Sequence, residues 1–529
     1  MKESHSHWQE LFQQGRLSRR SFITGAAALG IGSSFSLSPL NVFAADAVPK
    51  KGGTLKLGMS GGNTSDTLDP RLFTDWVPLN QAYMLMNGLV EIDEHNQAVP
   101  ELLESWEAKP GAKEWVFKVR KDVTFHNGKT LDADDILWSI NLHRGDQSRS
   151  AIKTQLDSIV NLVKSAPDEI TLTLDSGNAD LPYLLADYHL LVVPNGFNDW
   201  SHPIGTGPFV FGQYQPGVRS LFQRNPHYWK PNRAFVDAVE VLVINDATAR
   251  TNALISGQVH AINRVDFKTV DFLKRSPALN IVRSSGGQHF TFLMDCRTPT
   301  FSNNDVRLAI KYGIDREKIL STILRGYGQL GNDHPIPKTD RFFNHALEQR
   351  VYDPDKARFH LKKAGMDSLA VELSSSDAAF AGALDAAALF QDQAKKGGIQ
   401  VSIKRQPADS YWDDVWMKAP FCMGYWGGRP TADQMFSTAW QSTAKWNDTH
   451  WKNEKFDALL LQARSLLDDR KRAEIYGELQ SIARDDGGAM IPLFGDYLDA
   501  ASKKVGGIAP HPLFNFMGGR LAERVWLEA

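Results

Sequence analysis

The segment 419–436 contains the residues best suited to bind a small molecule. An apolar run ends in Tyr425 and Trp426, two glycines follow, and Arg429 and Asp433 lie just beyond them. Glycines let the backbone approach a ligand closely, aromatic rings supply flat apolar walls, and an arginine with an aspartate offers both signs of charge. The pattern indicates a recognition site at the end of a strand. An ordinary strand-to-helix loop, in which Asp433 only caps the helix, explains the same residues.

Tryptophans are concentrated around this segment. Such a cluster forms either the walls of a binding site or the core of a domain, and the sequence leaves both open. Six of the 14 tryptophans lie within forty positions, namely Trp412, Trp416, Trp426, Trp440, Trp446 and Trp451.

Other clusters of reactive side chains have simpler explanations. His126, Asp132 and Asp135 could be proposed as a metal site, but the spacing of the two aspartates is typical of a helix capping box. Cys296 and Cys422 are far apart and lack the spacing of a metal site. We expect two free thiols, and a disulfide between them stays open because sequence does not show geometry.

Composition indicates a soluble globular protein with more than one domain. The chain has 529 residues, of which 42% are hydrophobic and 23% charged, and domains usually contain about 100 to 200 residues. Its net charge is −2. Nucleic acids and anionic membranes both favour a strongly basic face, so neither is expected as a partner.

The first 44 residues have the pattern of an export signal. Arg19 and Arg20 precede a mildly apolar segment rich in glycine, alanine and serine, and Ala44 offers a cleavage position. This pattern predicts a twin-arginine signal and a periplasmic location. Glycines and Pro39 interrupt the apolar run, which disfavours a membrane anchor. Because no cysteine precedes Cys296, a lipid-anchored N-terminus is not expected.

The second half of the chain alternates between helical and strand patterns. This order predicts an α/β lobe with a largely parallel sheet. Phe421–Trp426 would be its next strand, and its carboxyl end falls on the two glycines, where open α/β sheets usually bind ligands. The preceding elements are predicted at 355–364 (helix), 370–373 (strand), 378–395 (helix), 399–405 (strand) and 410–417 (helix).

Several motifs distributed along the chain resemble one protein family. In order they are Gly52–Leu55, Val99–Trp106, Val123–Ile136, Ile204–Phe209, Arg224–Trp229, Val306–Ile310 and Ile314–Glu317. Their order and spacing closely resemble the family 5 extracellular solute-binding proteins of ABC importers, the group that contains dipeptide-, oligopeptide- and nickel-binding receptors.

The resemblance implies an α/β fold of two lobes with mixed sheets, an inserted subdomain and two crossover hinge segments. Lobe I would comprise residues 45–285, with the insertion at about 86–190, and the tail 490–529; lobe II would comprise residues 286–489. The crossovers are expected at Ile281–Phe292 and Gly488–Phe494. The implied function is capture of a peptide or peptide-like amino compound between the lobes and delivery to a membrane permease, by a monomer without catalysis or cofactor.

This chain differs from the family at the position that binds the ligand's amino group. Peptide binders of the family hold that group with an aspartate shortly after the aromatic pair, and the aligned position here is Gly428. Asp433 could replace the missing carboxylate, while Arg429 suggests an anionic acceptor such as a carboxylate. A small zwitterion or an amino-acid conjugate therefore fits as well as a free dipeptide.

The resemblance places candidate ligand-binding residues in both lobes. Three other functions remain open: carriage of chelated nickel or haem with His289 and His334, a periplasmic hydrolase, and a chemoreceptor adaptor. No Ser-His or Cys-His signature of a hydrolase stands out. The candidate ligand-binding residues are Tyr411, Tyr425, Trp426, Gly427, Gly428, Arg429 and Asp433 in lobe II, and Asn63, Thr64 and Trp76 in lobe I.

Overall fold

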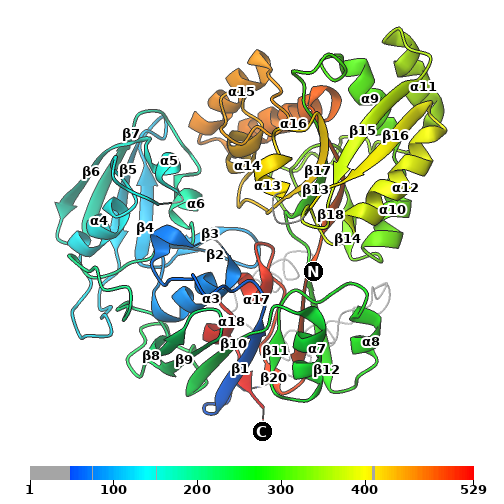
Figure 1. Cartoon of the computed structure of the whole chain (residues 1–529). Coiled ribbons are helices and arrows are strands. Elements are labelled where there is room, and N and C mark those ends of the chain that lie inside the picture. Colours follow the sequence, from blue (N-terminus) through cyan, green and yellow to red (C-terminus); the bar gives the residue numbers. More distant parts are fainter. Residues whose placement is uncertain (1–47, 74, 151, 408–410, 529) are drawn as a thin grey trace, which may run out of the picture. The chain divides into compact units, whose positions relative to one another are not determined.

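The computed structural model describes residues 48–528 except residues 74, 151 and 408–410. The described residues from 49 to 528 fold into two lobes, one with a seven-stranded and one with a six-stranded sheet (Figure 1). The predicted twin-arginine signal, residues 1–44, lies outside the described residues.

A seven-stranded mixed sheet combines the first half of the chain with its C-terminal part. The central strand β1 pairs in parallel with β10 and β11, and the other pairs are antiparallel. In order of pairing the strands are β12 (Leu279–Ser284), β19 (Tyr497–Ser502), β11 (Ala261–Ile262), β1 (Thr54–Met59), β10 (Ala238–Val243), β9 (Arg219–Arg224) and β8 (Phe209–Gln215).

A four-stranded antiparallel sheet has its own hydrophobic core. Trp115, Phe117 and Val119 alternate toward this core, as their spacing predicts. Helix α4 (Ala133–Asn141) begins with the predicted capping box, in which Asp132 and Asp135 each accept a hydrogen bond from the other's backbone N–H. The strands pair in the order β4 (Leu103–Ala108), β5 (Glu114–Val119), β7 (Glu169–Leu174) and β6 (Ile159–Ala166).

A six-stranded sheet forms the centre of lobe II. The prediction of a largely parallel sheet is wrong, because only the two pairs that involve β15 are parallel. Strands β13 and β18, which come from distant parts of the sequence, run antiparallel to their neighbours. The order is β14 (Gly328–Leu330), β18 (Ala489–Gly495), β13 (His289–Met294), β17 (Phe421–Trp426), β15 (Leu369–Ser375) and β16 (Ile399–Arg405).

The remaining strands form two small hairpins, β2 (Val90–Ile92) with β3 (Ala98–Pro100) and β20 (Val505–Gly506) with β21 (Trp526–Leu527). The helices are η1 (Pro70–Leu72), α3 (Trp76–Leu85), α5 (Lys153–Leu156), α6 (Leu181–Leu185), α7 (Ala247–Ile255), α8 (Val270–Lys274), α9 (Asn304–Tyr312), α10 (Arg316–Ile323), α11 (Pro354–Lys363), α12 (Ala383–Lys395), α13 (Tyr411–Asp414), α14 (Ala432–Ala439), α15 (Glu454–Ser465), α16 (Asp469–Asp486), α17 (Asn515–Gly518) and α18 (Leu521–Arg524).

The chain crosses from one large sheet to the other in two adjacent segments. Residues 285–288 connect β12 to β13, and Asp496 connects β18 to β19. The second crossing lies slightly later in the chain than predicted, because β18 still belongs to the six-stranded sheet. Asp496 forms an ion pair with Arg283 and accepts a hydrogen bond from the Ser285 hydroxyl at 2.9 Å, so the two crossings are tied together.

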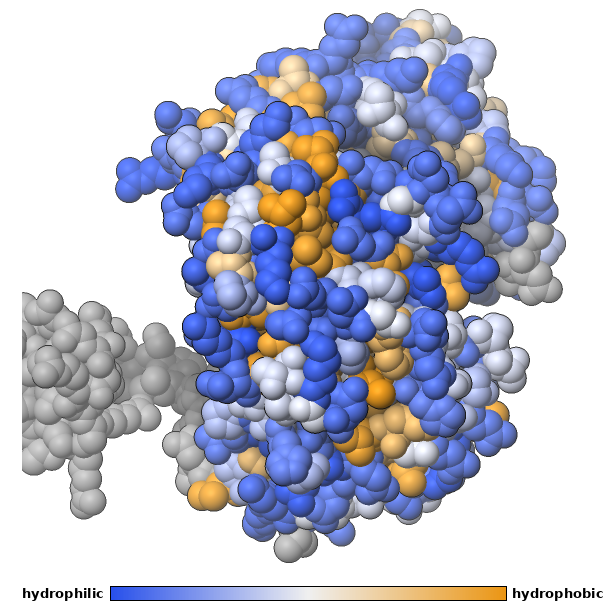
Figure 2. All heavy atoms as spheres, turned by 90° about the vertical axis from the view of Figure 1, so that its left-hand side faces the viewer, coloured by the Kyte–Doolittle hydropathy of each residue, from blue (hydrophilic) through white to orange (hydrophobic). Residues whose placement is uncertain are grey.

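On the face shown in Figure 2 hydrophilic residues predominate, and apolar residues gather in smaller patches. Within the described part of the chain, no helix combines the length and apolar character needed to cross a membrane.

A buried carboxylate ties the C-terminal part of the chain to lobe I. Glu101 accepts two hydrogen bonds of 2.7 Å from Arg520, one of 2.9 Å from Asn87 and one of 2.9 Å from Lys230. The Glu101 side chain is fully buried. Removing the Glu101 charge would leave the buried Arg520 with the longer contacts to Glu91 at 3.7 Å and Glu523 at 3.6 Å, and loss of the close buried partner is strongly destabilising.

We predict that Glu101→Gln lowers the free energy of unfolding by about 3 to 5 kcal/mol, because Arg520 loses its bidentate carboxylate. Urea denaturation of the variant and the wild type measures the difference. Glu104→Gln, at an exposed position in the next strand, is the control and should change stability by less than about 0.5 kcal/mol. Equal stabilities of the two variants would contradict the prediction.

Candidate functional site

A cavity of about 320 Å³ lies between residues of both lobes. This volume suits a small organic ligand. Lobe I contributes Phe73, Trp76, Tyr83, Val90, Ile92, Ile152, Gln155, Tyr183, Ala186, Asp187, Tyr188, His189, His511, Leu513, Phe514, Gly518 and Arg520, and lobe II contributes Gly427, Gly428, Arg429, Pro430, Gln434, Thr438 and Trp446.

Aromatic rings of lobe I form one wall of this cavity. The Trp76 and Phe514 rings lie 4.4 Å apart between centroids, and Tyr188 packs edge-on against Phe514 at 6.0 Å. The Tyr188 ring also contacts His189 at 4.1 Å. Such rings offer a large apolar surface with fixed geometry to a ligand.

Arg429 supplies an uncompensated positive charge to the cavity. Its guanidinium donates to the Gly427 and Gly428 carbonyl oxygens at 3.3 Å and lies 5.8 Å from the Trp426 ring centroid. Among the described residues no carboxylate lies within 4.0 Å of it, the limit for an ion pair. Arg429 can therefore offer several N–H donors to an anionic ligand group.

Arg520 also lines the cavity, but its charge is already compensated. Glu101 binds it through two hydrogen bonds of 2.7 Å, and its guanidinium lies 4.2 Å from the Tyr83 ring centroid. Arg520 therefore supports the cavity wall, and Arg429 is the arginine available to a ligand.

Gly428 packs directly against the first crossing segment. A Cβ atom on Gly428 would lie 2.8 Å from the Gly287 Cα, and one on Gly287 would lie 2.7 Å from the Gly428 Cα. Real Cβ atoms essentially never show contacts this short. The backbone contact therefore leaves no space for an aspartate at position 428.

Asp187 supplies the opposite charge from lobe I. Its Oδ1 lies 2.6 Å from Nδ1 of His189 and accepts the His189 backbone N–H at 2.9 Å. Burial raises the pKa of the Asp187 carboxyl, but its electrostatic contact and two hydrogen bonds with His189, and the more distant Arg429, outweigh burial and hold that pKa below its usual value. Asp187 is therefore ionised at neutral pH.

Gln434 leaves an acceptor unsatisfied beside the cavity. This residue lies in the first turn of α14, where Thr431 caps the helix by accepting from the Gln434 backbone N–H at 3.2 Å. The side-chain Oε1 of Gln434 is buried and has no hydrogen-bond partner in the described structure. Buried acceptors are usually paired, so a donor from a ligand would suit this position.

Four of the ten candidate residues from the sequence line the cavity. They are Trp76, Gly427, Gly428 and Arg429. The other six, Asn63, Thr64, Tyr411, Tyr425, Trp426 and Asp433, do not line it.

The side chains of lobe II that do not line the cavity have other partners. The buried Tyr411 hydroxyl donates to the Met423 carbonyl at 2.8 Å, and Trp426 donates its indole N–H to Asp448 at 2.9 Å. Asp433 is buried in an ion pair with Arg464, with Nε to Oδ1 at 3.0 Å. These contacts explain the side chains by packing and charge pairing.

The remaining candidates lie away from the cavity. Tyr425 is exposed and packs edge-on against Trp412 at 5.5 Å. Asn63 and Thr64 follow β1 and lie against the turn at Gly217, where a Cβ atom would lie 2.6 Å from their backbone atoms.

The histidines considered for a metal carrier lie outside the cavity lining. His289 is buried in β13, and His334 is buried beside a separate pocket of lobe II. In the described residues, no group of three or more His, Cys, Asp or Glu side chains is arranged to hold a metal ion. Cys296 and Cys422 are unpaired, as expected.

Sequence reasoning missed most of the lobe I wall. Asp187 lies in a mainly apolar run just beyond α6, which ends at Leu185. Residues 187–189 therefore leave the helix and turn toward the cavity. A charged residue inside an apolar run was the available signal.

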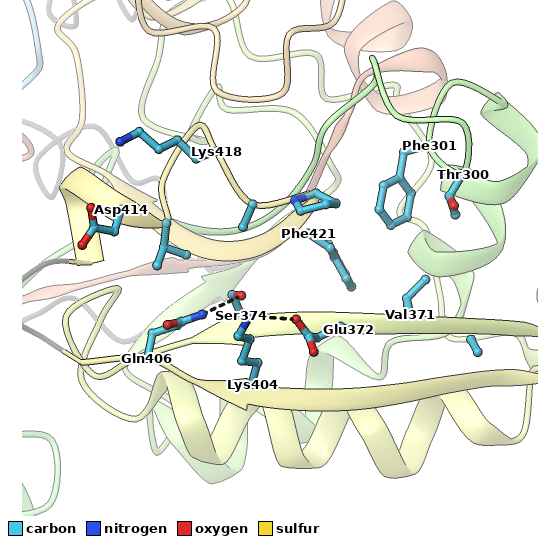
Figure 3. A pocket seen from close by; sticks show the side chains of 14 residues that line it. Thr300, Phe301, Val371, Glu372, Ser374, Lys404, Gln406, Asp414, Lys418 and Phe421 are labelled. Carbon is cyan, nitrogen blue, oxygen red and sulfur yellow. Dashed lines mark hydrogen bonds and ion pairs between the residues drawn. The ribbon is translucent and has the colours of Figure 1, made fainter.

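A second pocket, of about 400 Å³, lies wholly within lobe II beside β15 and β17 (Figure 3). Of its charged groups, Lys404 pairs with Glu372 at 3.4 Å, whereas Asp414 and Lys418 have no ion-pair partner among the described residues. Gln406 donates to the Ser374 hydroxyl at 3.2 Å. A ligand there would not contact both lobes, so the cavity at Arg429 is the better candidate.

Comparisons with known proteins agree with this architecture. A model of the bacterial extracellular solute-binding proteins, family 5 Middle, matches residues 97–448. The dipeptide-binding protein of Escherichia coli (strain K12) is 24% identical over 528 residues, covering 88% of this chain and 97% of that protein.

Two solved structures have the same fold. The periplasmic binding protein DppA from Helicobacter pylori, in complex with the peptide STSA, superposes with a TM-score of 0.76 at 22% identity, covering 91% of this chain and 99% of that one. The binding protein AgaA from A. tumefacien R10, in complex with agropinic acid, gives 0.75 at 25% identity, covering 90% and 99%.

The fold and the cavity define a two-lobed periplasmic binding protein. The chain belongs to family 5 of the bacterial extracellular solute-binding proteins. This family consists of receptors that bind a substrate, and its location is periplasmic.

Asp448 is a buried carboxylate in contact with the candidate segment, and its ionisation makes the stability of the protein depend on pH. It accepts indole N–H bonds from Trp426 at 2.9 Å and Trp416 at 3.3 Å. Burial raises the pKa of the Asp448 carboxyl from 3.8 to about 7. The folded protein therefore keeps this proton up to a higher pH than the unfolded chain does. The resulting stabilisation is complete below pH 3.8 and is lost as the pH rises to about 7.

We predict that Asp448→Asn weakens the loss of stability between pH 4 and pH 7, because the amide keeps an oxygen acceptor without ionising. Between pH 4 and pH 7 the variant should lose less of its free energy of unfolding than the wild type, by at most about 4 kcal/mol. Urea denaturation at several pH values measures it. The exposed Asp413→Asn variant should keep the wild-type pH dependence, and the same result for Asp448→Asn would rule out this role.

Proposed function

We propose that this protein is a receptor of an ABC importer, which captures a peptide or a peptide-like amino compound between its two lobes. Arg429 carries the proposal, because its guanidinium faces the cavity without a carboxylate partner. The unsatisfied Oε1 of Gln434 and the aromatic wall support a ligand that has both N–H donors and apolar surface. The named ligands of similar proteins, a dipeptide, the peptide STSA and agropinic acid, belong to this chemical range.

The proposed transport cycle follows from the two-lobed fold. Ligand enters while the lobes are apart, the lobes close over it, and the closed monomer docks on a membrane permease that receives the unchanged ligand. Lobe I comprises residues 45–285 and the C-terminal tail, lobe II begins at residue 286, and the return to lobe I takes place at Asp496. Residues 1–44 direct export by the twin-arginine route.

Ion pairs between the lobes support closure on a ligand. The buried Asp180, next to α6, pairs with Arg472 of α16 at 2.6 Å and with Arg341 at 2.7 Å. The Asn96 side chain donates to the Pro430 carbonyl at 3.0 Å at the edge of the cavity. Ligand binding and these contacts would stabilise the same closed state.

We predict that Arg429→Ala loses affinity with little loss of stability, because the side chain forms no ion pair with any other residue that the structure describes. Thermal-shift measurements with free dipeptides, opine-like conjugates and amino acids should identify wild-type ligands, whose stabilisation grows with concentration. Calorimetry with the strongest ligand should then show about 10- to 100-fold weaker binding for Arg429→Ala.

The exposed Arg405→Ala variant is the control and should bind like wild type. An unchanged dissociation constant for Arg429→Ala would remove this residue from the site. If no compound in the panel shifts the wild-type melting temperature, the proposed ligand class is wrong.

A further inference from the structure

Position 428, where family members have an aspartate for the ligand's amino group, carries no acidic side chain in this protein. An acidic side chain at position 428 would collide with Gly287, as the 2.8 Å distance from a Gly428 Cβ to the Gly287 Cα shows. Asp433 is buried in its ion pair with Arg464 and does not line the cavity. Neither position of this loop therefore offers a carboxylate to a ligand.

Asp187 is the only acidic residue among the described residues that line the cavity. Its Oδ1 is held by the His189 ring and backbone N–H, while no donor in the described structure bonds to Oδ2. The Asp187 side chain keeps 19% of its surface exposed. One carboxylate oxygen is thus fixed by the protein and the other is accessible from the cavity.

Asp187 and Arg429 face the same space from opposite lobes without touching. No ion pair joins them within 4.0 Å, yet the charge of Arg429 contributes to lowering the pKa of the Asp187 carboxyl. Two opposite charges that are near one another but not in contact leave room for a ligand between them.

We infer that Asp187 of lobe I binds the cationic group of the ligand while Arg429 of lobe II binds its anionic group, so that a zwitterion bridges the two lobes. The inference rests on the proposed function and names the class of substrate for that site. A ligand with both charges contacts both lobes, and this differential contact would favour the closed form over the open one. A compound lacking either charge would leave Asp187 or Arg429 without its charged ligand partner.

The test uses the strongest-binding compound from the panel of free dipeptides and amino-acid conjugates. Two derivatives of it are required: a desamino form, in which hydrogen replaces the ammonium group, and a carboxamide form, in which an amide replaces the carboxylate. Calorimetry with the wild type should show about 10- to 100-fold weaker binding of each derivative. Because this comparison needs no variant, it holds even if a substitution prevents folding.

Variants then assign each charge to its residue. Asp187→Asn should weaken binding of the parent compound about 10- to 100-fold, but it should change binding of the desamino form by less than about threefold. Asp305→Asn is the matched control, because Asp305 also pairs with a histidine ring, at 2.8 Å from His360 Nδ1, and lies outside the cavity. It should bind every compound like wild type.

The outcomes separate this inference from the proposed function. If the wild type binds the parent compound but Asp187→Asn binds it equally well, or the desamino form binds as tightly as the parent, the inference is overturned and the proposed function stands. If no compound of the panel binds to the wild type, the proposed ligand class and the inference both fail.

Discussion

The backbone contact between Gly287 and Gly428 is the constraint on which the site depends. Gly287 belongs to the first crossing between the two large sheets, and Gly428 is the second residue after β17, which ends at Trp426. Because a Cβ atom on either glycine would lie within 3 Å of the other backbone, the loop after β17 is pressed against the crossing. The same contact directs Arg429 into the cavity and excludes an acidic side chain at position 428.

Charge compensation decides which cavity residues are available to a ligand. Arg520 and Arg429 both line the cavity, but of these two arginines the buried Glu101 binds Arg520, through two hydrogen bonds of 2.7 Å. Asp433 and Asp187 differ in the same way, because Arg464 binds Asp433 in the interior while Asp187 keeps one oxygen free. Among the described cavity residues, Arg429 and Asp187 thus remain as one charged group of each sign that is available to a ligand.

The fold was largely predictable from the sequence, and the site only in part. Strand β17 has the predicted bounds, and the resemblance to family 5 is confirmed by the family model. The prediction of a largely parallel sheet was wrong because β13 and β18 enter this sheet from distant parts of the chain and run antiparallel to their neighbours. Tyr411 and Trp426 show why pocket side chains are hard to assign: both have polar tips with interior partners, and only coordinates reveal these. Asp187 was missed because a helix that ends early exposes it.

The identity of the natural ligand tests the central claim most directly. Protein purified from its native host is denatured, and the small molecules released are identified by mass spectrometry. The account predicts a small compound that carries both an ammonium group and a carboxylate, present in proportion to the protein and depleted in the Arg429→Ala variant. Release of a metal chelate, of haem, or of a compound without an anionic group would contradict it.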